Sequence, residues 1–93
     1  DDKSAGEIVK AILEKKKDYV PAKFLRARML QEQKQYLLSI AEFNSIMQIP
    51  EFERSIDELK IHYHLADLYH ETKQWKKEIE EYRIILGFNP DGR

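Results

Sequence analysis

The chain has 93 residues, of which 42% are hydrophobic, and this is enough for one small folded domain. Its 16 basic and 17 acidic residues give a net charge of -1, so the composition supplies no overall field for nucleic acid or an anionic membrane. There is no cysteine, which excludes disulfides and thiolate metal sites, and no apolar run approaches the roughly 20 residues of a membrane-spanning helix.

The first residues, DDKSAGE, contain neither an initiator Met nor a hydrophobic signal segment. We expect the chain to be an excised piece of a longer protein, and the sequence therefore assigns no compartment. Glycine and proline are scarce, and long segments carry apolar residues at helical spacing without sustained period-two alternation. These features predict an all-α chain.

The spacing predicts five helices, over residues 5–17, 21–33, 36–48, 56–71 and 75–87. The first begins at a capping box formed by Ser4 and Glu7. The second carries Pro21 in its first turn, where the missing N–H does no harm. Pro50 ends the third helix.

A second capping box, Ser55 with Glu58, begins the fourth helix, and Gly87 takes the C-cap role in the fifth. The third helix carries an apolar stripe that we expect to be buried: Tyr36, Ile40, Phe43, Ile46 and Met47. The fifth carries a stripe of the same spacing: Trp75, Ile79, Tyr82, Ile85 and Leu86. We expect Trp75 to be a core residue that clamps the two helices of its hairpin.

The second and third helices recur as the fourth and fifth after a shift of 39 residues (75 − 36). The joint QKQY at 33–36 then matches TKQW at 72–75. Further identities under this shift are Ala27 with Ala66, Glu32 with Glu71, Ile40 with Ile79, Glu42 with Glu81 and Ile46 with Ile85. The repeating unit is thus a helical hairpin, which needs a stacked neighbour to bury its apolar face.

The pattern resembles the tetratricopeptide repeat. The last unit matches that motif at His62, Leu65, Ala66, Tyr69, Trp75, Glu78, Tyr82, Ile85 and Pro90. The middle unit matches at Lys23, Arg26, Ala27, Leu30, Tyr36, Ser39, Phe43 and Ile46. The first helix fits as an orphan second helix, and the tripeptide NPD at 89–91 looks like the join to a next unit.

The resemblance covers residues 5–91 and implies a right-handed stack of antiparallel helix hairpins, a fragment of an α-solenoid. We expect a single domain over 1–93, made of the orphan helix 5–17 and the repeat units 20–50 and 56–90. The chain departs from the family at Lys34 and Lys73, which replace the glycine of the hairpin turn. A left-handed backbone would therefore cost more at these two lysines.

In the resembled family, the first helix of each hairpin lines a concave groove that holds an extended or helical peptide. The register places Phe24, Arg28, Gln31 and Glu32 in this groove from the middle unit. From the last unit it places Lys60, Tyr63, Asp67, His70 and Glu71 there. Phe24 and Tyr63 are expected as exposed aromatic anchors, unless they only pack on each other. The Lys and Asn pair by which some members clamp a C-terminal carboxylate is not reproduced.

Other chemistry has little support in the sequence. His64, Asp67 and His70 step by three residues, which converges poorly on a metal ion, and His62 fits a bulky core position. No constellation for catalysis or phosphate binding is present, so we expect no enzyme activity and no cofactor. The basic run in EKKKD at 14–18 is flanked by acids and suits a solvated helix end better than a nucleic-acid patch.

The sequence thus predicts a protein–protein interaction module, a scaffold, adaptor or assembly factor that binds a partner peptide or helix through its concave face. One alternative is a self-association module that stacks on its own copies or on the rest of the parent chain. Another is a regulatory repeat domain of a larger enzyme.

Overall fold

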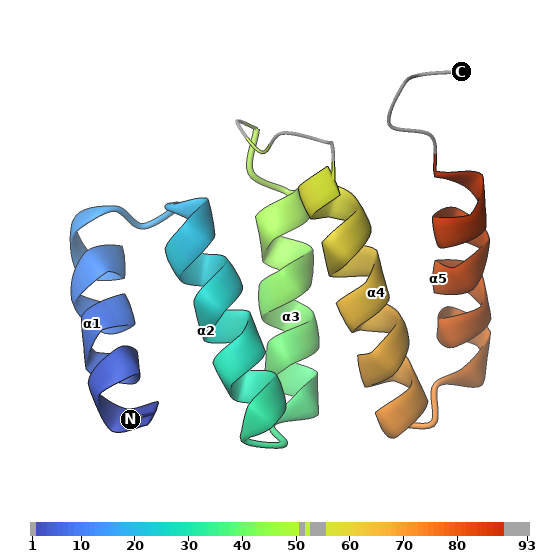
Figure 1. Cartoon of the computed structure of the whole chain (residues 1–93), viewed down its shortest axis with the longest axis horizontal. Helices are drawn as coiled ribbons and strands as arrows, with labels where there is room; N and C mark the ends of the chain where they lie inside the picture. The colour runs from blue at the N-terminus through green and yellow to red at the C-terminus, as the bar shows by residue number, and fades with distance from the viewer. Residues whose placement is uncertain (1, 51, 53–55, 89–93) are drawn as a thin grey trace. The chain divides into compact units, whose positions relative to one another are not determined.

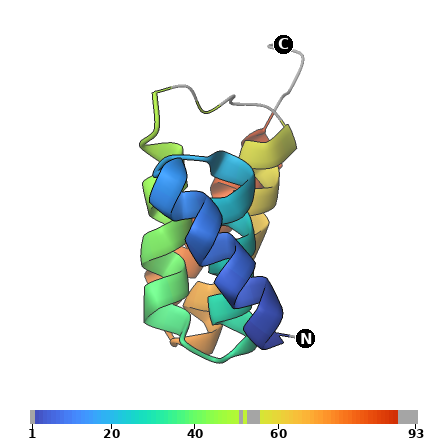
Figure 2. The ribbon, with the colours of Figure 1, turned by 90° about the vertical axis from the view of Figure 1, so that its left-hand side faces the viewer.

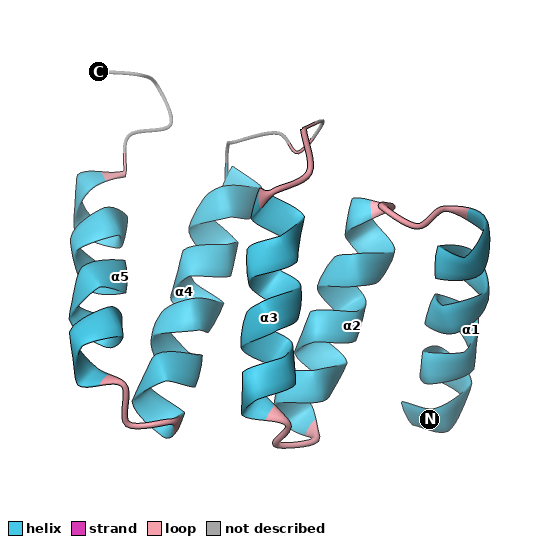
Figure 3. Ribbon diagram, turned by 180° about the vertical axis from the view of Figure 1, so that it is seen from behind, coloured by secondary structure: helices cyan, strands magenta, loops and turns pink. Residues whose placement is uncertain are grey.

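The computed structural model describes residues 2–50, 52 and 56–88 (Figure 1). Every element in these ranges is a helix (Figure 3), so the all-α prediction is confirmed. The helices are α1 (Asp2–Lys15), α2 (Val20–Glu32), α3 (Tyr36–Met47), α4 (Ile56–Glu71) and α5 (Trp75–Gly87). The chain divides into two compact units, unit 1 (Asp1–Phe52) and unit 2 (Glu53–Arg93), and each is described by itself.

The predicted single domain and right-handed stack stay predictions. Ser55, with its proposed capping box, and the segment 89–91 lie outside the described residues. The helix boundaries otherwise fall close to those predicted, and α4 and α5 begin and end where the spacing placed them.

Two predicted helix caps differ from the structure. The first helix already begins at Asp2, so Ser4 lies inside its first turn and is not the N-cap residue. Gly87 is the last residue of α5, and the cap is Phe88, whose backbone is extended. Pro21 does lie in the first turn of α2, as predicted.

In unit 1, α2 packs antiparallel to α3 around a buried set of small and large side chains. Ala27, Phe43 and Ile46 are each 0% exposed. The Ser39 hydroxyl, equally buried, donates a 2.7 Å hydrogen bond to the carbonyl oxygen of Ala27, which joins the two helices. The buried stripe predicted for this helix is thus confirmed at Phe43 and Ile46, while its other three members are half-buried.

The helix α1 also packs on α2, and it is the helix nearest the viewer in Figure 2. Val9 is its buried contact, at 3% exposure. Gly6 faces Met29 so closely that a Cβ atom added at Gly6 would lie 3.4 Å from Met29 Cε. In unit 1, α2 therefore covers the face of α1 that contains Gly6 and Val9.

Gly6→Ala is expected to stabilise the protein by about 0.5–1 kcal/mol. The glycine lies inside α1, where its backbone freedom weakens the helix, and the new methyl group would meet only the flexible end of Met29. Urea unfolding of the two proteins measures the difference. A lower stability of Gly6→Ala would show that the contact between α1 and α2 has no room for one methyl group.

In unit 2, α4 and α5 form a second antiparallel hairpin (Figure 1). The fully buried side chains Ile61, Leu65 and Leu68 all belong to α4. No residue of α5 is fully buried. The two helices of this hairpin therefore differ sharply in how much of their surface is covered.

Both hairpin joints have the same backbone geometry. Lys34 and Lys73 have φ angles of 62° and 58°, the left-handed region that favours glycine. In each joint, the backbone N–H groups of the lysine and of the residue after it donate hydrogen bonds to carbonyl oxygens of the preceding helix. The donor and acceptor residues are Gln35 and Leu30 (2.9 Å), Lys34 and Gln31 (3.0 Å), Gln74 and Tyr69 (2.8 Å), and Lys73 and His70 (3.1 Å). This is the Schellman pattern, and it explains why QKQY and TKQW agree at Lys-Gln.

Lys73→Gly is expected to stabilise the protein by up to about 1 kcal/mol, because glycine adopts a positive φ without a steric cost. Urea unfolding measures the change. The matched control is Lys76→Gly, which places glycine inside α5 and should destabilise by about 1 kcal/mol. A loss of stability in Lys73→Gly would mean that the lysine side chain contributes more than its strained backbone costs.

Candidate functional site

The predicted site residues of unit 2 lie together on one face of α4. They are Lys60, Tyr63, Asp67, His70 and Glu71, which follow one another at intervals of three, four, three and one residues. All five side chains are exposed. Tyr63 is the large apolar member of this set, with 53% of its surface open. We call these five residues the α4 face.

The predicted site residues of unit 1 are less uniform. Arg28 is exposed and Gln31 is half-buried. Phe24 is also half-buried, and its ring packs edge-on against Phe43 with 5.5 Å between centroids and an interplanar angle of 80°. The expectation that Phe24 is an exposed anchor is therefore wrong, because a ring on α3 covers part of it.

Glutamates and basic side chains join the helices of each hairpin. In unit 1, Arg26 Nε donates to Glu42 Oε2 at 2.6 Å. The repeat places Glu81 where Glu42 stands, and in unit 2 its Oε1 lies 2.6 Å from His62 Nδ1. His62 Nε2 lies 3.6 Å from Glu58 Oε1 on its own helix. His62 is 7% exposed, which confirms its predicted core position, although the contact it makes there is polar.

A second histidine contact lies close to the joint between α4 and α5. His70 Nδ1 lies 3.1 Å from Glu78 Oε2, and the His70 ring meets the Trp75 ring edge-on at 5.5 Å. Among the described residues, no group of three or more His, Asp and Glu is placed to hold a metal ion. His62 and His70 both contact α5 and contribute to the packing of α4 on α5.

On α5, the surroundings of the Tyr82 hydroxyl shift its pKa. Its hydroxyl donates to Glu78 Oε2 at 3.2 Å. This hydrogen bond, then partial desolvation and the negative charges of Glu78 and Asp67, raise the pKa of Tyr82 above its ordinary value of 10.0.

In an alkaline titration followed by absorbance, Tyr82 is therefore expected to ionise at a pH above its ordinary pKa of 10.0. Tyr82→Phe should remove this step from the titration curve. Because the folded-state pKa is raised, the stabilisation from this phenol is full below pH 10.0 and is lost as the pH rises through the folded-state pKa. Glu78→Gln should move the step to lower pH. A Tyr82 step at or below the ordinary value would contradict the hydrogen bond.

The apolar stripe of α5 is open, contrary to the expectation from its spacing. Trp75 is 51% exposed and is not a core residue, although it does contact His70 of the other helix. Ile79 is 53% exposed, Tyr82 44% and Leu86 86%, whereas Ile85, the fifth member of the predicted stripe, is half-buried. We call the four exposed residues, Trp75, Ile79, Tyr82 and Leu86, the α5 stripe. Helical spacing identifies a face that can be covered, but it carries no information on whether a covering helix is there.

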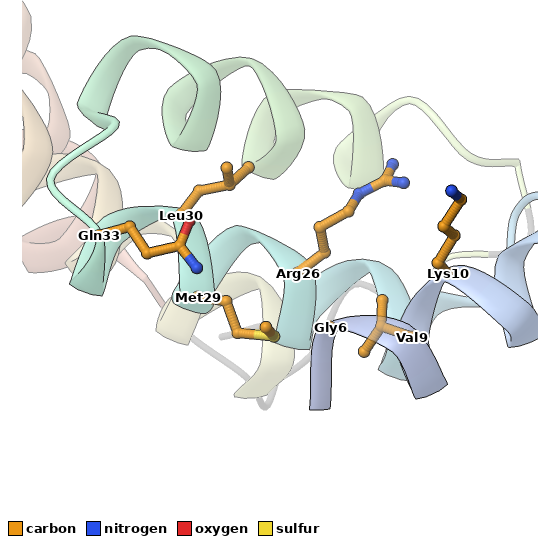
Figure 4. Close-up of a pocket in the computed structure, with 7 residues that line it drawn as sticks. All are labelled: Gly6, Val9, Lys10, Arg26, Met29, Leu30 and Gln33. Atoms are coloured by element: carbon orange, nitrogen blue, oxygen red, sulfur yellow. The ribbon is translucent and has the colours of Figure 1, made fainter. Parts of the chain in front are cut away.

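A cleft of about 380 Å³ lies between α1 and α2 (Figure 4). Val9, Met29 and Leu30 make it partly apolar, and the side chains of Lys10 and Arg26 rise on the same side of it. Arg26 is held there by Glu42. None of the sequence-predicted site residues lines this cleft, so it is distinct from the α4 face.

No family model matches the chain, and neither a curated protein nor a solved structure matches it. Among the described residues, no helix combines the length and the apolar character needed to cross a membrane.

Proposed function

We propose that the chain is a protein–protein interaction module, similar to tetratricopeptide repeats, whose α4 face binds a partner peptide or helix. The observation that carries the proposal is Tyr63, an aromatic side chain that is 53% exposed in the middle of a polar helix face. Large aromatic rings surrounded by polar side chains are typical energetic centres of protein interfaces, because they bury much area at little entropic cost.

The neighbours of Tyr63 supply selectivity in this proposal. Lys60 offers a cation one turn before Tyr63. Asp67 and Glu71 offer carboxylates one and two turns after Tyr63. In the repeat of unit 1, Arg28 and Gln31 stand at the positions of Asp67 and His70. A partner with both charge signs around an apolar residue would complement the α4 face.

Tyr63→Ala is expected to weaken binding of a partner, captured from native lysate and identified by mass spectrometry, by about tenfold or more. Its stability should change little, because the ring is half open to solvent. The matched control is Tyr19→Ala, which removes a ring of similar exposure, 42%, from the loop before α2. Equal partner binding by the wild type and Tyr63→Ala, with both folded, would contradict the proposal.

A further inference from the structure

The α5 stripe has the dimensions of a helix-docking surface. Trp75, Ile79, Tyr82 and Leu86 follow one another at four, three and four residues, and therefore form one line along almost the whole of α5. Each is at least 44% exposed, and Leu86 is 86% exposed. Large side chains exposed singly are ordinary, but four of them in one continuous line indicate an interaction surface.

The repeat shows what covers such a stripe. The shift of 39 residues relates Ile79 and Tyr82 to Ile40 and Phe43 of α3, and Phe43 is 0% exposed. The sequence relates Phe43 in turn to Val9 of α1 by a shift of 34 (43 − 9). Val9 is 3% exposed, and the face to which it belongs packs on α2. In unit 1 the covering element at this position is thus a helix.

The two flanks of the α5 stripe differ in charge. On one flank, Glu78 and Glu81 turn toward α4, where they meet His70 and His62. On the other flank, Lys76, Glu80 and Arg83 follow one another at four and three residues, and all three are exposed. The open flank of the stripe therefore carries two cations and one carboxylate.

The positive charge is concentrated at the beginning of α5. A hollow of about 360 Å³ there is lined by Lys73, Gln74, Trp75, Lys76 and Lys77. Its lining contains three lysines and no acidic residue, and Trp75 supplies its apolar wall. A carboxylate placed in this hollow would meet several ammonium groups and the amino-terminal end of a helix, both of which favour a negative charge.

We propose that the α5 stripe binds an acidic amphipathic helix of another protein, with its carboxylates along Lys76 and Arg83 and in the lysine-lined hollow. The charges disfavour a second copy as the occupant. In a symmetric antiparallel pair of α5 helices, Trp75 would lie opposite Leu86 of the copy, and the lysine-lined hollow would meet residues 84–88, which include no carboxylate. A second copy would therefore place no negative charge in the hollow, whereas an acidic helix does.

The test uses two synthetic helical peptides with leucines at the spacing of the stripe. One carries glutamates on the flank that meets Lys76 and Arg83, and the other carries lysines at the same positions. Trp75 is the chain's one tryptophan, so its fluorescence reports binding at the stripe. The acidic peptide is expected to bind at least tenfold more tightly than the basic one, with a preference that weakens as salt is raised.

Two variants separate the stripe from other surfaces without disturbing the core. Leu86→Asn should weaken binding of the acidic peptide about tenfold or more, and it removes a side chain that is already 86% exposed. The double charge reversal Lys76→Glu with Arg83→Glu should invert the preference between the two peptides. Tyr63→Ala should leave both affinities unchanged, because that ring belongs to the α4 face.

Three results would overturn the proposal. The first is equal affinity for the two peptides, or no affinity for either. The second is a loss of peptide binding in Tyr63→Ala, which would place the peptide on the α4 face. The third is concentration-dependent dimerisation, seen by light scattering together with a change in Trp75 fluorescence, which would make a second copy the occupant. Failure of the α4-face proposal leaves all peptide results unchanged, so the two proposals fail separately.

Discussion

Phe43→Ala is expected to lower the free energy of unfolding by about 3–5 kcal/mol, the largest effect of any substitution considered. The ring of Phe43 is 0% exposed and packs edge-on against Phe24. Its removal forfeits the transfer free energy of a large apolar side chain and leaves a cavity between α2 and α3. Urea unfolding followed by circular dichroism measures the loss.

The repeat supplies a matched control for this experiment. Tyr82 occupies the same repeat position as Phe43 but is 44% exposed, so Tyr82→Ala should cost less than about 1 kcal/mol. Similar losses for the two substitutions would mean that the α5 stripe is covered in solution. A small loss for Phe43→Ala alone would contradict the buried hairpin core of unit 1.

His62→Leu is the second substitution with a large expected effect, a loss of about 2–3 kcal/mol. The side chains of Glu81 and Glu58 are 12% and 17% exposed, and His62 contacts a carboxylate of each. Leucine fills a similar volume but offers no hydrogen bond, so two largely buried carboxylates would lose a partner. The measurement is urea unfolding followed by Trp75 fluorescence, since Trp75 lies in the same hairpin.

Two further variants test whether the lost partner is the cause. The double variant His62→Leu with Glu81→Leu should recover part of the loss, because it removes the stranded carboxylate together with its partner. His70→Leu should change stability by less than about 1 kcal/mol, because the His70 side chain is 62% exposed and its contact with Glu78 is screened by water. If His62→Leu is as mild as His70→Leu, the buried histidine contributes only its packing.

The local features of the chain were accessible from its sequence. Periodic apolar residues and Pro21 located all five helices, since helix position follows from spacing and turn chemistry that act over a few residues. The agreement of QKQY with TKQW indicated one joint used twice, and the structure gives Lys34 and Lys73 the same positive φ in both joints. The first cap was misplaced because a helix can extend beyond a capping box when the preceding residues also favour helix.

The candidate surfaces could be predicted only in part, because the exposure of a side chain depends on which residues of other helices lie against it. The register correctly placed five exposed residues on one face of α4, because residues at helical spacing share a face whatever surrounds them. It did not anticipate that Phe24 is partly covered by Phe43, or that His62 meets Glu81. These contacts join residues 19 positions apart, and no local pattern distinguishes a histidine with an acidic partner from one among apolar side chains.

By itself, therefore, the sequence determined the helices, their joints and the repeat, because backbone preference and periodicity are properties of neighbouring residues. Only the tertiary structure decided which of two stripes of the same spacing is the more deeply buried. Ile40 and Phe43 on α3 have the same spacing as Ile79 and Tyr82 on α5, yet Phe43 is 0% exposed and Tyr82 is 44% exposed. The difference depends on whether another element covers the stripe, and coverage is a property of packing that no single segment encodes.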